Sequence, residues 1–259
     1  MSRKIGLKAL VVTSLFVALA VVLRFFSIMV PIGGAGAMRV SLDGIPMKMP
    51  SIIFGPFIGG ISGAMTDLLA YIVKPMGGYI PLLTVTSVLG CIFTGFIWNK
   101  IGDISVHKVE KLYFIFSISL GGIGFISHLF LKVFTNTYIY QLLSMLGKKA
   151  LFVAVALETI SILSLIILSI NKILKNKNFK GHIYDNYIKM LLSVGIPSLI
   201  VTTLNTYILI MFIPALAGKG FMIFWIPRIT EAFMMIVIQS YMMSSILCLY
   251  KEFQYRFNN

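Results

Sequence analysis

The stretch from Arg39 to Gly95 reads RVSLDGIPMKMPSIIFGPFIGGISGAMTDLLAYIVKPMGGYIPLLTVTSVLGCIFTG. It is strongly apolar, yet glycines, prolines and five charged residues interrupt it; the charges are Arg39, Asp43, Lys48, Asp67 and Lys74. A lipid-exposed helix avoids such residues, because a charge near the bilayer centre costs about 3 kcal/mol or more. The stretch therefore predicts a polar pocket between membrane helices, which holds a small polar molecule.

The composition assigns the whole chain to a membrane. Of its 259 residues, 58% are hydrophobic and 12% are charged, whereas a soluble globular chain has about 25% charged residues. The formal net charge is +14, but lysine and arginine gather at the ends of apolar runs and do not form one patch. That clustering indicates membrane orientation and argues against nucleic-acid binding. We expect an all-α integral membrane protein with a single transmembrane domain over residues 1–259.

The apolar runs predict about eight helices, the second of them short because Gly55-Pro56 breaks it. Their expected ranges are 6–26, 40–54, 57–73, 81–99, 112–133, 150–170, 188–214 and 227–250. An even number of helices and the lysine and arginine counts of the short loops favour cytoplasmic termini. The first helix is expected to remain uncleaved, since its apolar run continues without a small-residue cleavage pattern.

This topology brings polar residues from distant segments to one depth in the outer half of the bundle. We expect Arg39, Asp67, Asn205 and Arg228 to line a pocket. For Lys48 and Glu231, pairing or helix packing is an equal alternative to ligand contact, because interhelical hydrogen bonds also stabilise helix association in lipid.

These residues belong to a set of short motifs whose order and spacing resemble those of a known family. The set comprises Arg39-Val-Ser-Leu-Asp-Gly-Ile-Pro46, Phe54-Gly55-Pro56-Phe-Ile-Gly59, Gly63, Asp67-Leu-Leu, Pro75-x-Gly-Gly-Tyr79-x-Pro81, Thr84, Gly90, Asn205-Thr206-Tyr207, Pro227-Arg228-x-x-Glu231 and Ile238-Gln239. Together they resemble the substrate-binding S component of energy-coupling factor (ECF) vitamin transporters, most closely the folate-type branch. The resemblance covers roughly residues 5–100 and 188–255.

The resemblance implies a six-helix bundle in a bacterial cell membrane that captures a vitamin, here expected to be folate, near the outer face. It also implies partners: a transmembrane coupling subunit and two cytoplasmic ATPase subunits. The chain has no Gly-x-x-x-x-Gly-Lys-Ser/Thr phosphate loop, so ATP hydrolysis is expected in the partners. Small residues of the first helix contact the coupling subunit in this family, which makes Ser14 and Ala18 candidates for that interface. Packing inside the bundle is the alternative for both.

A folate-like ligand needs aromatic walls, a few hydrogen bonds and cations for its carboxylates. The candidate walls are Tyr79, Tyr207 and Trp225, and the candidate cations are Arg39, Lys74 and Arg228. Asp67 or Asn205 could bind ring nitrogens, and Glu231 completes the expected substrate-binding set. The glycine-rich loop 75–81 is a candidate lid. Surrounding lipid is the remaining expected partner, and no cofactor is expected.

Residues from about 105 to 185 have no counterpart in the six-helix pattern and are expected to form an inserted transmembrane hairpin. Within it, His128 and Glu158 fall at similar depth. We expect them to pair, since a buried carboxylate without a partner is costly. The alternative is that they mark an enlarged or altered site.

Two other function classes were compared with the binding-subunit prediction. A stand-alone proton-coupled secondary transporter, with Asp67 or Glu158 as the proton carrier, predicts an inverted repeat, and the sequence shows no convincing one. A membrane enzyme is disfavoured because carboxylates and histidines are scarce and catalytic motifs are missing. The two cysteines and three histidines lack metal-ligand spacing, so neither a catalytic residue nor a metal site is expected.

Overall fold

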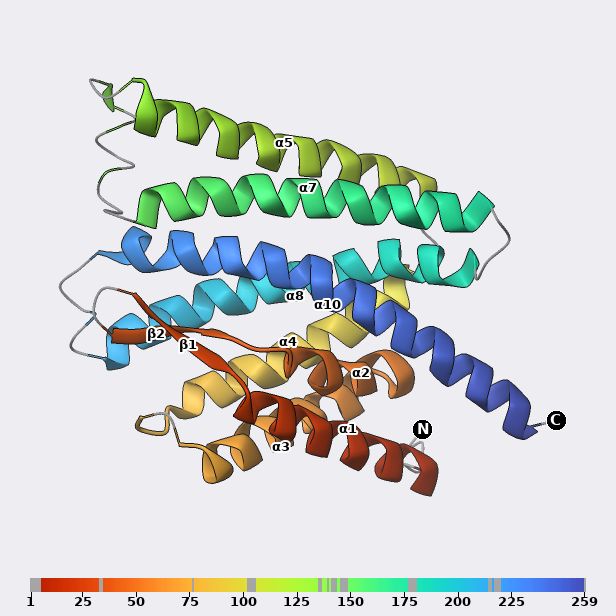
Figure 1. Cartoon of the computed structure of the whole chain (residues 1–259). Coiled ribbons are helices and arrows are strands. Elements are labelled where there is room, and N and C mark those ends of the chain that lie inside the picture. Colours follow the sequence, from red (N-terminus) through yellow and green to blue (C-terminus); the bar gives the residue numbers. More distant parts are fainter. Residues whose placement is uncertain are drawn as a thin grey trace.

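The computed structural model places most of the chain in long helices (Figure 1). It describes residues 6–32, 35–75, 77–101, 106–134, 137, 138, 140, 144, 149–176, 181–213, 216 and 220–258. Met76 of the candidate lid and residues 177–180, between the sixth and seventh expected helices, lie outside the described residues.

Eight helices account for most of these residues and confirm the all-α membrane class. They are α1 (Leu7–Phe25), α2 (Gly44–Phe54), α3 (Pro56–Val73), α4 (Pro81–Ile101), α5 (Val106–Lys132), α7 (Lys149–Asn176), α8 (Gly181–Phe212) and α10 (Phe221–Asn258). Within the described part of the chain, all except the 11-residue α2 are long and apolar enough to cross a membrane. Helices α7, α8 and α10 extend well beyond the expected apolar runs.

The second expected helix starts too early, because Val40 is the last residue of a β-hairpin and the helix begins only at Gly44. Strands β1 (Ile28–Ile32) and β2 (Ala35–Val40) pair in antiparallel fashion, with Ile28 opposite Val40. A lone hairpin is marginally stable, but Val30 and Val40 pack against a buried cluster around Leu216 and Phe224. Contacts with a segment almost 200 residues away in sequence thus support the hairpin, and local hydropathy does not reveal them.

The break between α2 and α3 follows directly from the sequence. Gly55 has a φ of +99°, which favours glycine, and Pro56 begins α3, where its missing N–H costs no helical hydrogen bond. The close approach of neighbouring helices also needs glycine: a Cβ at Gly95 would lie 2.7 Å from the Ser51 carbonyl oxygen. Helices α2, α3 and α4 can therefore pack tightly against one another.

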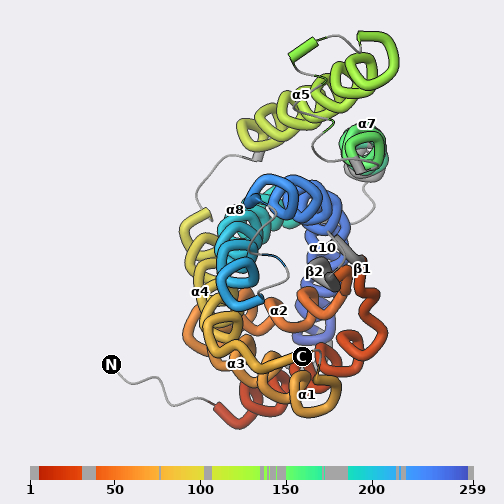
Figure 2. The backbone as a smooth tube through the Cα atoms, turned by 90° about the vertical axis from the view of Figure 1, so that its left-hand side faces the viewer, coloured from red at the N-terminus to blue at the C-terminus, as the bar shows by residue number. Residues whose placement is uncertain are grey.

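Viewed end-on, helices α1, α2, α3, α4, α8 and α10 form a ring, and α5 and α7 lie outside it (Figure 2). Helix α7 contacts α8 and α10, while the main partner of α5 is α7. Helix α1 begins and α10 ends at one end of the bundle, and the β-hairpin lies at the other (Figure 1).

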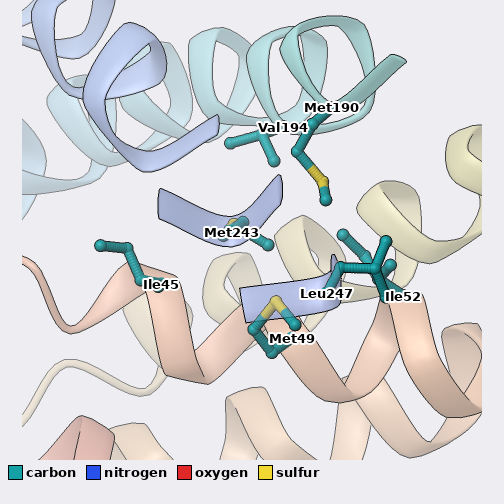
Figure 3. Packing of buried hydrophobic residues seen from close by; sticks show 7 residues of the cluster. All are labelled: Ile45, Met49, Ile52, Met190, Val194, Met243 and Leu247. Atoms are coloured by element: carbon teal, nitrogen blue, oxygen red, sulfur yellow. The ribbon is translucent and has the colours of Figure 1, made fainter. Parts of the chain in front are cut away.

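A buried apolar cluster joins α2 to the first half of α8 and the second half of α10 (Figure 3). Its members are Ile45, Met49, Ile52, Met190, Val194, Met243 and Leu247. Flexible methionine side chains fill the irregular space between three helices. Helix α8 starts and α10 ends at the end of the bundle where both termini lie, so the apolar cluster fills the ring at that end. Space for polar groups remains in the half that contains the β-hairpin.

Candidate functional site

A cavity of about 740 Å³ opens at the hairpin end of the ring. Its walls come from the end of α1, the β-hairpin, the α3–α4 connection, the end of α8 and the start of α10. The volume lies within the range of small-molecule sites, about 300–1,000 Å³. Segments at both extremes of the sequence thus build one polar compartment inside an apolar bundle.

Nearly all the substrate-binding residues expected from the sequence line this cavity. They are Arg39, Asp67, Lys74, Tyr79, Asn205, Arg228 and Glu231. The α3–α4 loop contributes Gly77, Gly78 and Ile80 as well, so the candidate lid forms part of the wall.

Two expected aromatic walls lie elsewhere. Tyr207 is 65% exposed, because it follows Asn205 by two residues and therefore projects from the opposite side of α8. Trp225 donates its indole N–H to Thr203 Oγ1 at 3.0 Å and thereby links α10 to α8. The aromatic residues that do line the cavity are Tyr71, Tyr79 and Phe212.

An ion-pair network at the cavity wall includes Arg24, which is not among the site residues expected from the sequence. Its Nη1 lies 2.8 Å from Asp67 Oδ1, and its Nε lies 3.9 Å from Asp43 Oδ2. Asp43 also accepts a hydrogen bond from Arg39 Nη2 at 3.5 Å. Two carboxylates in an apolar stretch require cationic partners, and that requirement was the signal that could have identified Arg24.

Further hydrogen bonds tie the candidate lid to this network. Thr84 donates to Asp67 Oδ2 at 2.6 Å, and the hydroxyls of Tyr79 and Thr84 lie 2.8 Å apart. The rings of Tyr71 and Tyr79 are 5.0 Å apart. Lys74 Nζ donates to the Phe25 carbonyl at 2.7 Å, which anchors the end of α3 to the end of α1. Loop, α1 and α3 are thereby fixed relative to one another.

A smaller chamber of about 180 Å³ lies next to the cavity, and the two share Arg39, Ser87, Thr202, Asn205 and Glu231. Lys48 lines this chamber and does not reach the main cavity. Its side chain is buried, and its Nζ donates to Ser198 Oγ at 2.7 Å. Lys48 therefore pairs with α8, which was one of the two alternatives expected from the sequence. It also lines the small chamber.

With this geometry established, comparison with known proteins identifies the family. Residues 4–175 match the family described as ECF-type riboflavin transporter, S component. The chain belongs to this family. The matched range includes α5 and almost all of α7 and ends before α8 and α10. It therefore does not distinguish the expected inserted hairpin from the six-helix core.

One curated relative is similar to this S component at 34% identity over 131 residues. It is the folate transporter FolT of Clostridium novyi (strain NT), and the similar region covers 50% of this chain and 66% of the relative. The alignment thus spans slightly less than two thirds of the relative's length. No solved structure matches the chain.

The expected pairing in the outer helices of this S component is confirmed. His128 Nδ1 of α5 lies 3.2 Å from Glu158 Oε1 of α7, and both side chains are 28% exposed. Neither residue lines the cavity or the chamber. Their pairing therefore stabilises the α5–α7 contact and gives no support to an enlarged site.

The two candidate interface residues of the S component share an exposed face of α1. Ser14 and Ala18 are both exposed, and the Ser14 hydroxyl donates to the Leu10 carbonyl of its own helix at 2.9 Å. Packing inside the bundle, the alternative considered from the sequence, is therefore wrong for these residues. The face toward the rest of the ring carries Thr13, Val17 and Ala20.

Proposed function

We propose that this chain is the membrane-embedded substrate-binding subunit of an ECF-type ABC importer and that it captures folate from outside the cell. The observation that carries the proposal is the cavity at the end of the bundle opposite the termini, with its concentrated cationic side chains. In this topology both termini are cytoplasmic and the cavity faces outward.

The charges of the cavity match an acidic ligand better than a neutral one. Four cations line it, Arg24, Arg39, Lys74 and Arg228, against the two carboxylates of Asp67 and Glu231. Asp67 is engaged by Arg24, and Asp43 by Arg39. Folate joins an aromatic heterocycle to two carboxylates, whereas riboflavin carries an uncharged sugar-alcohol chain. Guanidinium groups bind carboxylates through paired, charge-assisted hydrogen bonds, which favours folate.

The remaining parts of the importer are assigned to partners. A transmembrane coupling subunit would dock on the α1 face that carries Ser14 and Ala18, where small residues permit close helix contact. Two cytoplasmic ATPase subunits would supply ATP hydrolysis, since the sequence contains no phosphate loop. In this assignment the chain is a transport subunit and not an enzyme.

We further propose that the α5–α7 pair, within the range of about 105–185, is an insertion outside the binding core of residues 5–100 and 188–255. In support, α8 and α10 supply Asn205, Arg228 and Glu231 to the cavity, while no described residue of α5 or α7 lines it. Deletion of the pair with a short linker should leave folate binding intact, whereas loss of binding by the folded deletion variant would contradict the insertion.

The decisive experiment is mass spectrometry of small molecules released from detergent-purified protein that was produced in vitamin-rich medium. Folate at about one molecule per chain is the expected result. A protein that releases no vitamin, binds none when folate is added, and moves solute in proteoliposomes without ATPases would refute the proposal and favour a secondary transporter.

A further inference from the structure

The chamber beside the main cavity is too small for a complete vitamin. Its volume of about 180 Å³ falls below the roughly 300 Å³ at which small-molecule sites begin. Because it shares Arg39, Asn205 and Glu231 with the main cavity, a ligand that fills the cavity can extend one end into the chamber. The chemistry of the chamber therefore decides which end enters.

One side of the chamber presents a strong hydrogen-bond donor. The Lys48 side chain is 8% exposed, and among the described residues its Nζ donates to Ser198 Oγ alone. An ammonium group has three N–H donors, so it has capacity for an acceptor that a ligand supplies. Burying such a group is costly unless acceptors are provided, and a bound ligand would provide them.

The chamber also presents acceptors, namely the carboxylates of Asp43 and Glu231 and the amide of Gln239. In the chamber the two carboxylates are balanced by two cations, Arg39 and Lys48. The main cavity sets four cations (Arg24, Arg39, Lys74 and Arg228) against two carboxylates (Asp67 and Glu231), so the acidic end of a ligand is more stable there. The chamber carboxylates are well suited to a group that donates N–H bonds. The chamber thus combines a donor with acceptors and fits an uncharged edge that carries both kinds of group.

We propose that this chamber binds the aminopyrimidinone edge of a pterin ring, with Lys48 donating to the ring's carbonyl oxygen or a ring nitrogen. Glu231, at the boundary with the main cavity, accepts hydrogen bonds from the ring N–H and the amino group. The acidic tail then lies in the main cavity among Arg24, Lys74 and Arg228. This assignment rests on the proposed function and adds Lys48 to its site as a specificity-determining residue.

The same arrangement discriminates against flavins. The corresponding edge of a flavin has a carbonyl on each side of its single N–H, so one carbonyl oxygen would face a carboxylate of the chamber. A buried polar group left without a hydrogen-bond partner is costly. The chamber should therefore select a pterin over a flavin, although the name of the matching family refers to riboflavin.

The test uses the full chain in detergent and measures competition against radiolabelled folic acid. The probes are 6-hydroxymethylpterin (the ring without the tail), 4-aminobenzoylglutamate (the tail without the ring) and riboflavin. For Lys48→Met, we expect the inhibition constant of the ring probe to rise at least tenfold and that of the tail probe to change less than twofold. Ser198→Ala removes the hydroxyl that positions Lys48 and should raise the inhibition constant of the ring probe by a smaller factor.

Lys100→Met is the matched control, because Lys100 lies in the last turn of α4, at the opposite end of that helix from the cavity, and stacks over Phe96. It should leave all three constants unchanged. If Lys48→Met does not fold, Ser198→Ala carries the test alone. Three results would overturn the inference. The first is an unchanged inhibition constant of the ring probe in these variants, and the second is an equal rise for the ring and tail probes. The third is a wild-type protein that prefers riboflavin to folic acid. A wild-type protein that binds neither vitamin would instead refute the proposed function.

Discussion

Arg24 and Asp67 join the end of α1 to α3 across the cavity wall, with 2.8 Å between Nη1 and Oδ1. Their side chains are 17% and 10% exposed. The same carboxylate accepts the Thr84 hydroxyl, which in turn contacts Tyr79. One ion pair therefore connects three parts of the molecule: the helix with the candidate partner face, the helix that begins the lid, and the lid itself.

Replacing Asp67 with alanine should destabilise the protein, because it leaves the Arg24 guanidinium without its nearest counter-charge. We expect a loss on the order of 2 kcal/mol, since removing one partner of a buried pair is costly. That loss corresponds to a fall in Tm of roughly 4–8 °C, measurable by thermal unfolding in detergent. The double variant Arg24→Ala/Asp67→Ala should lose less than the sum of the single variants.

Glu110→Ala is the control for this effect. Glu110 pairs with His107 at 3.6 Å, but the histidine side chain is 93% exposed. Exposed pairs contribute about 0–1 kcal/mol, so this variant should unfold close to the wild-type temperature. A similar fall in Tm for Asp67→Ala and Glu110→Ala would show that the Arg24–Asp67 pair stabilises the protein no more than an exposed pair does.

Arg228→Ala should weaken folate binding by roughly tenfold or more, about 1.4 kcal/mol. The reason is the loss of a guanidinium that lines the main cavity near Glu231. Equilibrium binding of radiolabelled folate by purified protein measures the change. Lys100→Ala, remote from the cavity, serves as the control. Wild-type affinity in Arg228→Ala would exclude this residue from the site.

Gly95→Ala should destabilise the bundle without touching the cavity. The added Cβ would lie 2.7 Å from the Ser51 carbonyl oxygen and 2.9 Å from Pro56 Cα, both backbone atoms that cannot move independently. Overpacking of this kind costs typically about 1–3 kcal/mol. Gly122→Ala on α5 is the matched control, since nothing lies within 4 Å of its Cβ position. A lower Tm for Gly122→Ala than for Gly95→Ala would contradict the packing argument.

Ser14→Leu combined with Ala18→Leu should abolish uptake in cells that contain the partner subunits while folate binding by the purified chain stays unchanged. Bulky side chains on this exposed face of α1 would hold a partner helix at a greater distance. Ser119→Leu on α5 is a close control, because Ser119 is likewise exposed and donates to a carbonyl four residues earlier at 2.9 Å. Normal uptake by the α1 double variant would place the coupling interface elsewhere.

The membrane class, the approximate ranges of the helices and most of the charged residues of the cavity follow from the sequence alone. Hydropathy and helix breakers such as Gly55-Pro56 act locally, so they can be recognised in a short window of sequence. Charges such as Asp67 and Arg228 stand out because lipid cannot accommodate them. The His128–Glu158 pair was predicted for the same reason.

Which charges meet and which helix faces turn inward depends on how the helices pack. Helical periodicity places Asn205 and Tyr207 on opposite sides of α8, but only the packing of α8 shows that Asn205 faces the cavity. The β-hairpin is supported by Leu216 and Phe224, and Arg24 finds Asp67 from 43 residues away. The chamber around Lys48 forms where α2, α4, α8 and α10 converge. Such contacts depend on how helices pack across the whole chain, and no local pattern encodes that arrangement.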